Sequence, residues 1–131
     1  YNSVRCFRVA LGAASGSASI VENANAGMAA LVDGTDIRVV TLDSMNLSDV
    51  SFIKIDAEGW ECDVLDGARE TIARCRPTML IEVNESALKS RGRSPAELIT
   101  KIEGMRYSLR NVYPGQKMTG PQYDALCHPL F

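Results

Sequence analysis

The alternation of apolar and polar positions predicts strands in the first part of the chain. Residues 4–11 alternate and are typical of a strand, residues 17–21 of a short second strand, and residues 37–42 of a third. Residues 22–34 are rich in Ala, Asn and Gly and show no period, so we expect a loop there. The polar run 43–49 predicts a connector with a helical turn at most.

From residue 51 onward, strand-like and helix-like patterns follow one another. Residues 51–55 form a short apolar strand, and after Gly59 the apolar residues recur at the helical period. This helix is expected to end before Pro77, and residues 78–83 form the next apolar strand. The residues that share one face of the helix are Trp60, Val64, Leu65, Ala68 and Ile72.

A second helix has a clear start signal. Ser94 is a suitable N-cap, Pro95 fits the first helical position, and Glu97 is placed to close a capping box. Residues 107–113 then predict a further strand, whereas the tail 122–131 shows no clear pattern.

The order strand, helix, strand, helix, strand predicts an α/β fold. We expect a mostly parallel sheet with helices on both faces, and a single domain over residues 1–131. No apolar run approaches the roughly 20 residues of a membrane helix. The net charge of −2 gives no reason to expect nucleic acid as a partner.

The ends and the cysteines of the chain bear on where the protein works. The chain opens without a signal peptide and without methionine, so we expect it either to begin inside a longer parent or to be an engineered chain, and we expect a cytoplasmic location. The four cysteines form no close pair, which predicts free, mostly buried thiols in a reducing compartment rather than a zinc site. The one histidine, His128, lies in the tail and is expected at the surface.

Polar side chains follow two of the predicted strands where each strand ends. Asp56 and Glu58 come after residues 51–55, and Glu82 and Asn84 close the strand that begins at Thr78. If these strands are parallel neighbours, the four side chains converge at one edge of the sheet, where α/β proteins bind ligands.

Each of these side chains also has a structural interpretation. The position of Glu58 suits a cap of the following helix as well as it suits a role in a site, whereas that of Asp56 favours a role in a site. Glu82 lies in an apolar run and needs a partner if it is buried, and an ion pair with Lys54 explains it as well as a functional role does. Trp60 favours a core or pocket-wall position.

Several common catalytic motifs are missing from the sequence. The turn at residues 12–16 follows a strand but lacks the lysine of a P-loop, and neither a GxGxxG nor a GxSxG motif occurs. These absences weigh against a kinase or a serine hydrolase.

The order and spacing of four segments resemble FkbM-type methyltransferases. The combination of KIDAEG with a following IEV is fairly specific, and the resemblance covers residues 4 to 110. The segments that carry it are residues 39–43, 52–59, 64–68 and 76–83.

The resemblance implies a partial Rossmann-like methyltransferase fold, the carboxyl-terminal two-thirds of such a domain. Ala10 and Leu11 would then lie near the adenine of S-adenosylmethionine. The family's first strand, its glycine-rich cofactor loop and the acidic residue that holds the ribose are expected upstream of residue 1. Without the first two strands of the family, residues 51–55 would be a bare edge, so we expect residues 4–11 to lie beside that strand or to pair with another chain.

The function implied is methyl transfer from S-adenosylmethionine to a hydroxyl of a small molecule or glycan. Asp56 is the candidate base, Glu58 and Glu82 would hold the acceptor or the cofactor's amino group, and Ala10, Leu11 and Asp56 would bind the cofactor. Mg²⁺ is compatible with the three carboxylates but not required.

Two alternatives stay open at this point. The chain could be a non-catalytic α/β module that folds or forms homo-oligomers through the exposed edge without binding cofactor. A weaker alternative is a metal-dependent enzyme, built on the carboxylates, that does not transfer methyl groups.

Overall fold

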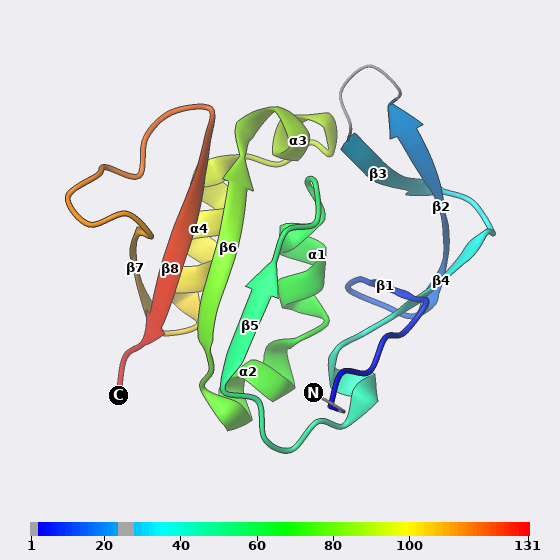
Figure 1. Cartoon of the computed structure of the whole chain (residues 1–131), viewed down its shortest axis with the longest axis horizontal. Coiled ribbons are helices and arrows are strands. Elements are labelled where there is room, and N and C mark those ends of the chain that lie inside the picture. The colour runs from blue at the N-terminus through cyan, green and yellow to red at the C-terminus, as the bar shows by residue number, and fades with distance from the viewer. Residues whose placement is uncertain (1–2, 24–27) are drawn as a thin grey trace.

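The computed structural model describes residues 3–23 and 28–131, which form two four-stranded sheets (Figure 1). The strands of the first sheet are, in spatial order, β1 (Ala10–Leu11), β4 (Ile37–Val40), β2 (Gly16–Asn23) and β3 (Met28–Asp33). Those of the second sheet are β5 (Phe52–Ile55), β6 (Thr78–Asn84), β8 (Gln122–Pro129) and β7 (Tyr107–Asn111). The helices are η1 (Asp43–Met45), α1 (Glu61–Asp66), α2 (Arg69–Cys75), α3 (Glu85–Ser90) and α4 (Pro95–Gly104).

The sheets are mixed, so the expectation of a mostly parallel sheet is wrong. β5 and β6 are parallel neighbours, as are β1 and β4, but β8 runs antiparallel to both β6 and β7. Most of the tail that showed no clear pattern is therefore β8, one of the two inner strands of the second sheet. Its pairing with β6 supplies the hydrogen bonds that local sequence did not predict.

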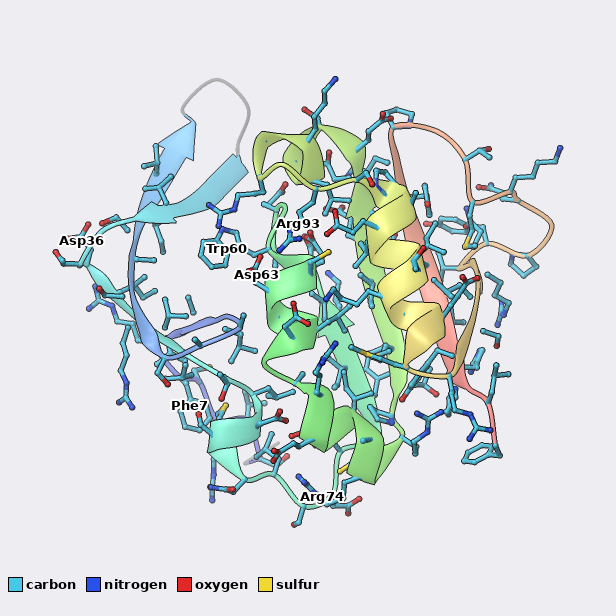
Figure 2. The ribbon with its side chains drawn as sticks, turned by 180° about the vertical axis from the view of Figure 1, so that it is seen from behind. Phe7, Asp36, Trp60, Asp63, Arg74 and Arg93 are labelled. Carbon is cyan, nitrogen blue, oxygen red and sulfur yellow. The ribbon has the colours of Figure 1, made fainter. Side chains whose placement is uncertain are left out.

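The described helices do not cover both faces of the second sheet, contrary to expectation. Helices α1, α2 and α4 lie on one face in both views, and α3 lies at the end of β6 (Figures 1 and 2). β6 shows the consequence: Met79, Ile81 and Val83 are buried against the helices, while Leu80 and Glu82 on the other face are only half-buried. The alternating burial along β6 is therefore that of a sheet with one covered face.

The first sheet differs most from the expected arrangement. Only Ala10–Leu11 of the predicted strand 4–11 is a strand, and it pairs with β4 rather than with β5. The predicted loop over residues 22–34 is instead the end of β2 and the whole of β3, paired antiparallel, with residues 24–27 outside the described ones. Cross-strand pairing outweighs the weak local strand preference of this Ala-rich segment.

The helix predicted after Gly59 is broken at Gly67 into α1 and α2. A side chain at Gly67 would lie 2.0 Å from the carbonyl oxygen of Gly12, so the loop after β1 touches the backbone at this point. The carbonyl of Gly67 also accepts a hydrogen bond from the amide of Asp43 at 2.9 Å. The loop after β1 and the start of η1 therefore both contact the chain at Gly67, where the helix is broken. Local sequence patterns do not predict such contacts between distant segments.

Asp43 caps α2 from outside the helix. Its carboxylate accepts hydrogen bonds from the amides of Thr71 (2.8 Å) and Glu70 (3.0 Å). Burial opposes ionisation, but the bonds from Thr71 and Glu70 and the nearby Arg74 hold the pKa of Asp43 below its ordinary value. This carboxylate joins the connector after β4 to the helix layer of the second sheet.

Replacing Asp43 with alanine should lower the free energy of unfolding by about 1 kcal/mol at neutral pH, since a helix cap is lost. Because the folded pKa is lowered, the contribution is present above the unfolded pKa near 3.8 and disappears as pH falls through the folded value. Urea unfolding of both proteins at neutral pH and at about pH 3 should therefore show a difference that shrinks in acid. Asp49→Ala, at an exposed position, is the control; an equal loss in both variants contradicts the cap.

The cysteines are free within the described residues. Cys62 and Cys127 are buried, and burial raises the pKa of their thiols to about 11 and about 12. Cys75 is half-buried and Cys6 is exposed, so the prediction of buried thiols holds for part of the set. In the described part of the chain, the helices are too short to span a membrane.

Candidate functional site

A cleft of about 500 Å³ lies between the two sheets. Ala10 and Leu11 of β1 line one side, and the whole of β5 lines the other. Asp56 and Glu58, which follow β5, lie at its end. The structure therefore brings the three residues predicted to contact the cofactor, Ala10, Leu11 and Asp56, to one cleft.

Three carboxylates meet at the rim of this cleft. Asp56 and Glu58 follow β5, and Glu82 lies near the end of the neighbouring β6. One oxygen from each of them lies within 4.8 Å of the others. The parallel pairing of β5 with β6 puts their carboxyl ends at one edge, so the predicted catalytic residues are brought together.

Asp56 is exposed and forms an ion pair with Lys54. The Lys54 Nζ lies 2.9 Å from Asp56 Oδ2, and this contact raises the pKa of Lys54. The alternative in which Lys54 is the partner of Glu82 is therefore wrong: the ammonium pairs with Asp56, which lies two residues further along the chain, just after β5. Lys54 therefore contacts one of the two oxygens of the Asp56 carboxylate.

Glu58 occupies an unusual backbone position in the turn after β5. Its φ is 47°, and that of Gly59 is 99°, so two successive residues adopt left-handed conformations. For a non-glycine residue this conformation costs about 1 kcal/mol or more. Strain of this kind persists only where the surrounding contacts enforce it.

The Glu58 side chain does not cap α1, which begins without a side-chain cap. Burial first, and then the charges of Asp56 and Glu61, raise the pKa of its carboxyl group. Its Oε2 atom is buried and has no hydrogen-bond partner within the described residues. An unsatisfied oxygen at a cleft is a natural acceptor for a ligand's N–H or O–H group.

Glu61 is the residue of the site that sequence reasoning missed. It is only 1% exposed, and its Oε1 accepts hydrogen bonds from the amides of Ala57 and Gly59, both at 3.1 Å. These bonds hold the left-handed turn that carries Glu58. The signal was present, since a carboxylate in the first turn of a helix commonly accepts backbone N–H bonds.

Glu82 is half-buried and bonded to the neighbouring strand. Its Oε1 accepts a hydrogen bond from Gln122 Nε2 at 2.7 Å. Burial raises the pKa of its carboxyl group, the bond from Gln122 opposes this, and the charges of Asp56 and Glu58 add to it. Asn84, also expected at this edge, instead caps α3 by accepting from the amide of Ala87.

Trp60 projects from the start of α1 toward the first sheet (Figure 2). The Arg91 guanidinium lies 4.1 Å from the centre of its ring. Gly59, next to it, approaches α3 so closely that a side chain would come within 2.5 Å of the Ala87 carbonyl oxygen. These contacts join the turn after β5 to α3 and keep the carboxylate rim in place.

A family profile described as the FkbM methyltransferase domain matches residues 3–109. The chain belongs to the FkbM methyltransferase family. The match includes β5, the turn after it and β6, and therefore all three rim carboxylates. No curated protein and no solved structure was found to be significantly similar to the chain.

The strand order of the second sheet is β5-β6-β8-β7, with the last strand of the chain inserted between its two predecessors. β8 and the segment before it lie beyond the matched residues.

Proposed function

We propose that this FkbM-family protein transfers a methyl group from S-adenosylmethionine to a hydroxyl of a small molecule or glycan. The observation that supports the proposal is the continuity of the cleft: a largely apolar wall at Ala10 and Leu11 leads to a rim of three carboxylates. An apolar pocket with a few convergent polar groups is the usual form of a small-molecule site.

The residues present fit this cofactor. S-adenosylmethionine joins a flat base to a positively charged sulfonium and ammonium, and the cleft likewise joins apolar side chains to carboxylates. The buried, unpartnered Oε2 of Glu58 offers an acceptor for an ammonium or hydroxyl group. When bound, the cofactor supplies an electrophilic methyl group.

The carboxylates then have distinct roles in this proposal. Asp56, paired with Lys54, accepts the proton of the acceptor hydroxyl. Glu58 and Glu82 hold the hydroxyl or the cofactor's amino group by hydrogen bonds. Their raised pKa values reflect carboxylates that gain from a cationic or hydrogen-bond-donating ligand.

A divalent cation is a secondary part of the proposal. Three carboxylate oxygens within 4.8 Å of one another form a geometry that Mg²⁺ can use, although exposed acidic groups often lie together without a metal. Mg²⁺ would screen the mutual repulsion of Asp56, Glu58 and Glu82 and could orient the acceptor oxygen.

Calorimetric titration of S-adenosylhomocysteine into this chain, with and without Mg²⁺, tests the proposal. Micromolar binding is expected, because the apolar wall and the carboxylates are both preformed. Tighter binding of S-adenosylhomocysteine in the presence of Mg²⁺ would support a metal ion at the three carboxylates. Absence of binding up to millimolar concentration would overturn the proposal for this chain.

The second candidate is a non-catalytic module that associates through its sheet edge. The observation that favours it is β5: it lies at the end of the second sheet, and Phe52 on it is 53% exposed beside the apolar cleft. Bare strand edges are templates for pairing with another chain. Light scattering coupled to gel filtration tests this candidate, which predicts a dimer or larger species that Phe52→Lys converts to monomer.

A further inference from the structure

A second, smaller cavity lies next to the carboxylate rim, at the carboxyl end of β6. We call it the polar pocket, and its volume is about 220 Å³. Its lining consists of residues with hydrogen-bonding side chains, namely Glu82, Asn111, Tyr113, Gln116, Gln122, Tyr123 and Asp124. Apart from Glu82, these residues lie beyond the residues that the family profile matches.

Hydrogen bonds at both ends of the loop between β7 and β8 hold the polar pocket, and the lining residue Asn111 makes two of them. The buried Asn111 donates to the carbonyl of Lys117 at 3.1 Å and accepts from the amide of Tyr113 at 2.9 Å. The amide of Glu85 donates to the carbonyl of Pro121 at 2.8 Å. Both ends of the loop between β7 and β8 are therefore fixed to the sheet and to α3, which preorganises a site.

Glu82 connects the polar pocket to the rim. Glu82 lines the pocket, and its carboxylate accepts a hydrogen bond from Gln122 at 2.7 Å. One of its carboxylate oxygens also lies within 4.8 Å of a carboxylate oxygen of Asp56 and of Glu58. A ligand in the polar pocket that bonds to Glu82 is thus placed directly beside the proposed reaction centre.

The chemistry of the lining selects the ligand. Carboxylates at Glu82 and Asp124 accept from hydroxyl groups, the amides of Gln116 and Gln122 both donate and accept, and the exposed Tyr113 offers a ring face. No cation is among the lining residues, so anionic groups are repelled. The volume is below the roughly 300–1,000 Å³ of sites that enclose a whole drug-sized ligand, so it suits a single ring.

We infer that the polar pocket binds one neutral, hydroxyl-rich ring of the methyl acceptor and presents an adjacent hydroxyl to the carboxylate rim. Binding of the ring depends on the pocket alone. Its placement for methyl transfer rests on the proposed function.

Chemical-shift titration of the ¹⁵N-labelled chain tests the binding step. The probes are methyl α-glucopyranoside and methyl α-mannopyranoside, with methyl α-glucuronide as the anionic counterpart, each added to high millimolar concentration. We expect a neutral glycoside to shift the amides of Glu82 and of residues 111–124. The glucuronide should bind about tenfold more weakly, because a like charge faces two carboxylates.

Tyr113→Ala is the matching variant, since Tyr113 is 61% exposed and its removal leaves the core intact. We expect it to weaken glycoside binding about two- to twelvefold, the effect of losing one aromatic contact. Lys117→Ala, in the same loop but outside the lining, should leave binding unchanged.

Titration of S-adenosylhomocysteine into Tyr113→Ala separates this inference from the proposed function. Unchanged cofactor binding together with weaker glycoside binding supports the polar pocket. Absence of shifts at residues 111–124 with either neutral glycoside, equal binding of the glucuronide, or an equal effect of Lys117→Ala overturns it, whether or not the cofactor binds.

Discussion

Replacing Glu61 with alanine should destabilise the protein by about 3 kcal/mol and lower its Tm by about 10 °C. Glu61 is buried, and its carboxylate satisfies the amides of Ala57 and Gly59. Alanine leaves both amides without an acceptor, and hydrogen bonds to a charged group are each worth about 1.5–3 kcal/mol. The left-handed turn at Glu58 and Gly59 then loses the contacts that hold it.

Part of this loss is offset because the second carboxylate oxygen of Glu61 is buried without a partner in the described structure. Removing that oxygen relieves a desolvation cost, which is why we expect about 3 kcal/mol rather than the sum of two full bonds. Glu61→Gln keeps one carbonyl oxygen as an acceptor and should lose about half as much.

Thermal and urea unfolding of Glu61→Ala, Glu61→Gln and Glu103→Ala measure the effect. Glu103 is an exposed glutamate on α4, and its replacement should change stability by no more than about 0.5 kcal/mol. If Glu61→Ala is no less stable than Glu103→Ala, the carboxylate does not hold the turn.

The same turn shows how far the sequence alone could predict the site. The apolar strand before Asp56 and the glycine after Glu58 predicted a strand, a turn and a helix in this order, and the structure confirms them. Parallel pairing of two such strands then requires their carboxyl ends to meet, so the cluster of Asp56, Glu58 and Glu82 follows from pattern and topology.

Contacts between distant segments account for what the sequence did not predict. Lys54 could reach Asp56 or Glu82, and only the three-dimensional arrangement decides for Asp56. Glu97 was expected to close a capping box, but its side chain pairs with Arg93, while Ser94 alone caps α4. In each case the side chain had more than one possible partner within reach, and the sequence alone did not decide between them.

The sequence predicted the strands whose apolar residues alternate clearly. It missed the strands whose conformation depends on hydrogen bonds to a neighbouring strand. β6 buries every second residue and was predicted almost to its ends. β3 and β8 depend on hydrogen bonds to β2 and to β6, and their sequences have no strict alternation of their own. The short α3 was missed as well, although Asn84 before it is a good N-cap residue.

Asp56→Asn should reduce methyl transfer by about 10²–10⁴-fold if Asp56 is the base of the proposed reaction. Asparagine keeps the shape of the side chain and one acceptor oxygen but cannot take a proton at neutral pH. The substitution also removes the ion pair with Lys54, whose partners are both well exposed, so the effect on stability should be below about 1 kcal/mol.

The rate can be measured as S-adenosylhomocysteine formed from S-adenosylmethionine with the neutral methyl glycosides as acceptors. Asp49→Asn, the same substitution at an exposed residue that does not itself line the cleft, is the control and should keep the full rate. An Asp56→Asn protein as fast as this control would exclude Asp56 as the base.

Binding of S-adenosylhomocysteine to the same variant separates the two roles proposed for Asp56. If its carboxylate acts mainly on the acceptor, the rate falls while cofactor affinity changes by less than about tenfold, since asparagine still accepts a hydrogen bond. If the carboxylate instead holds the cofactor, affinity falls together with the rate. The proton would then pass to Glu58 or Glu82, whose raised pKa values place them closer to neutral pH than an ordinary glutamate.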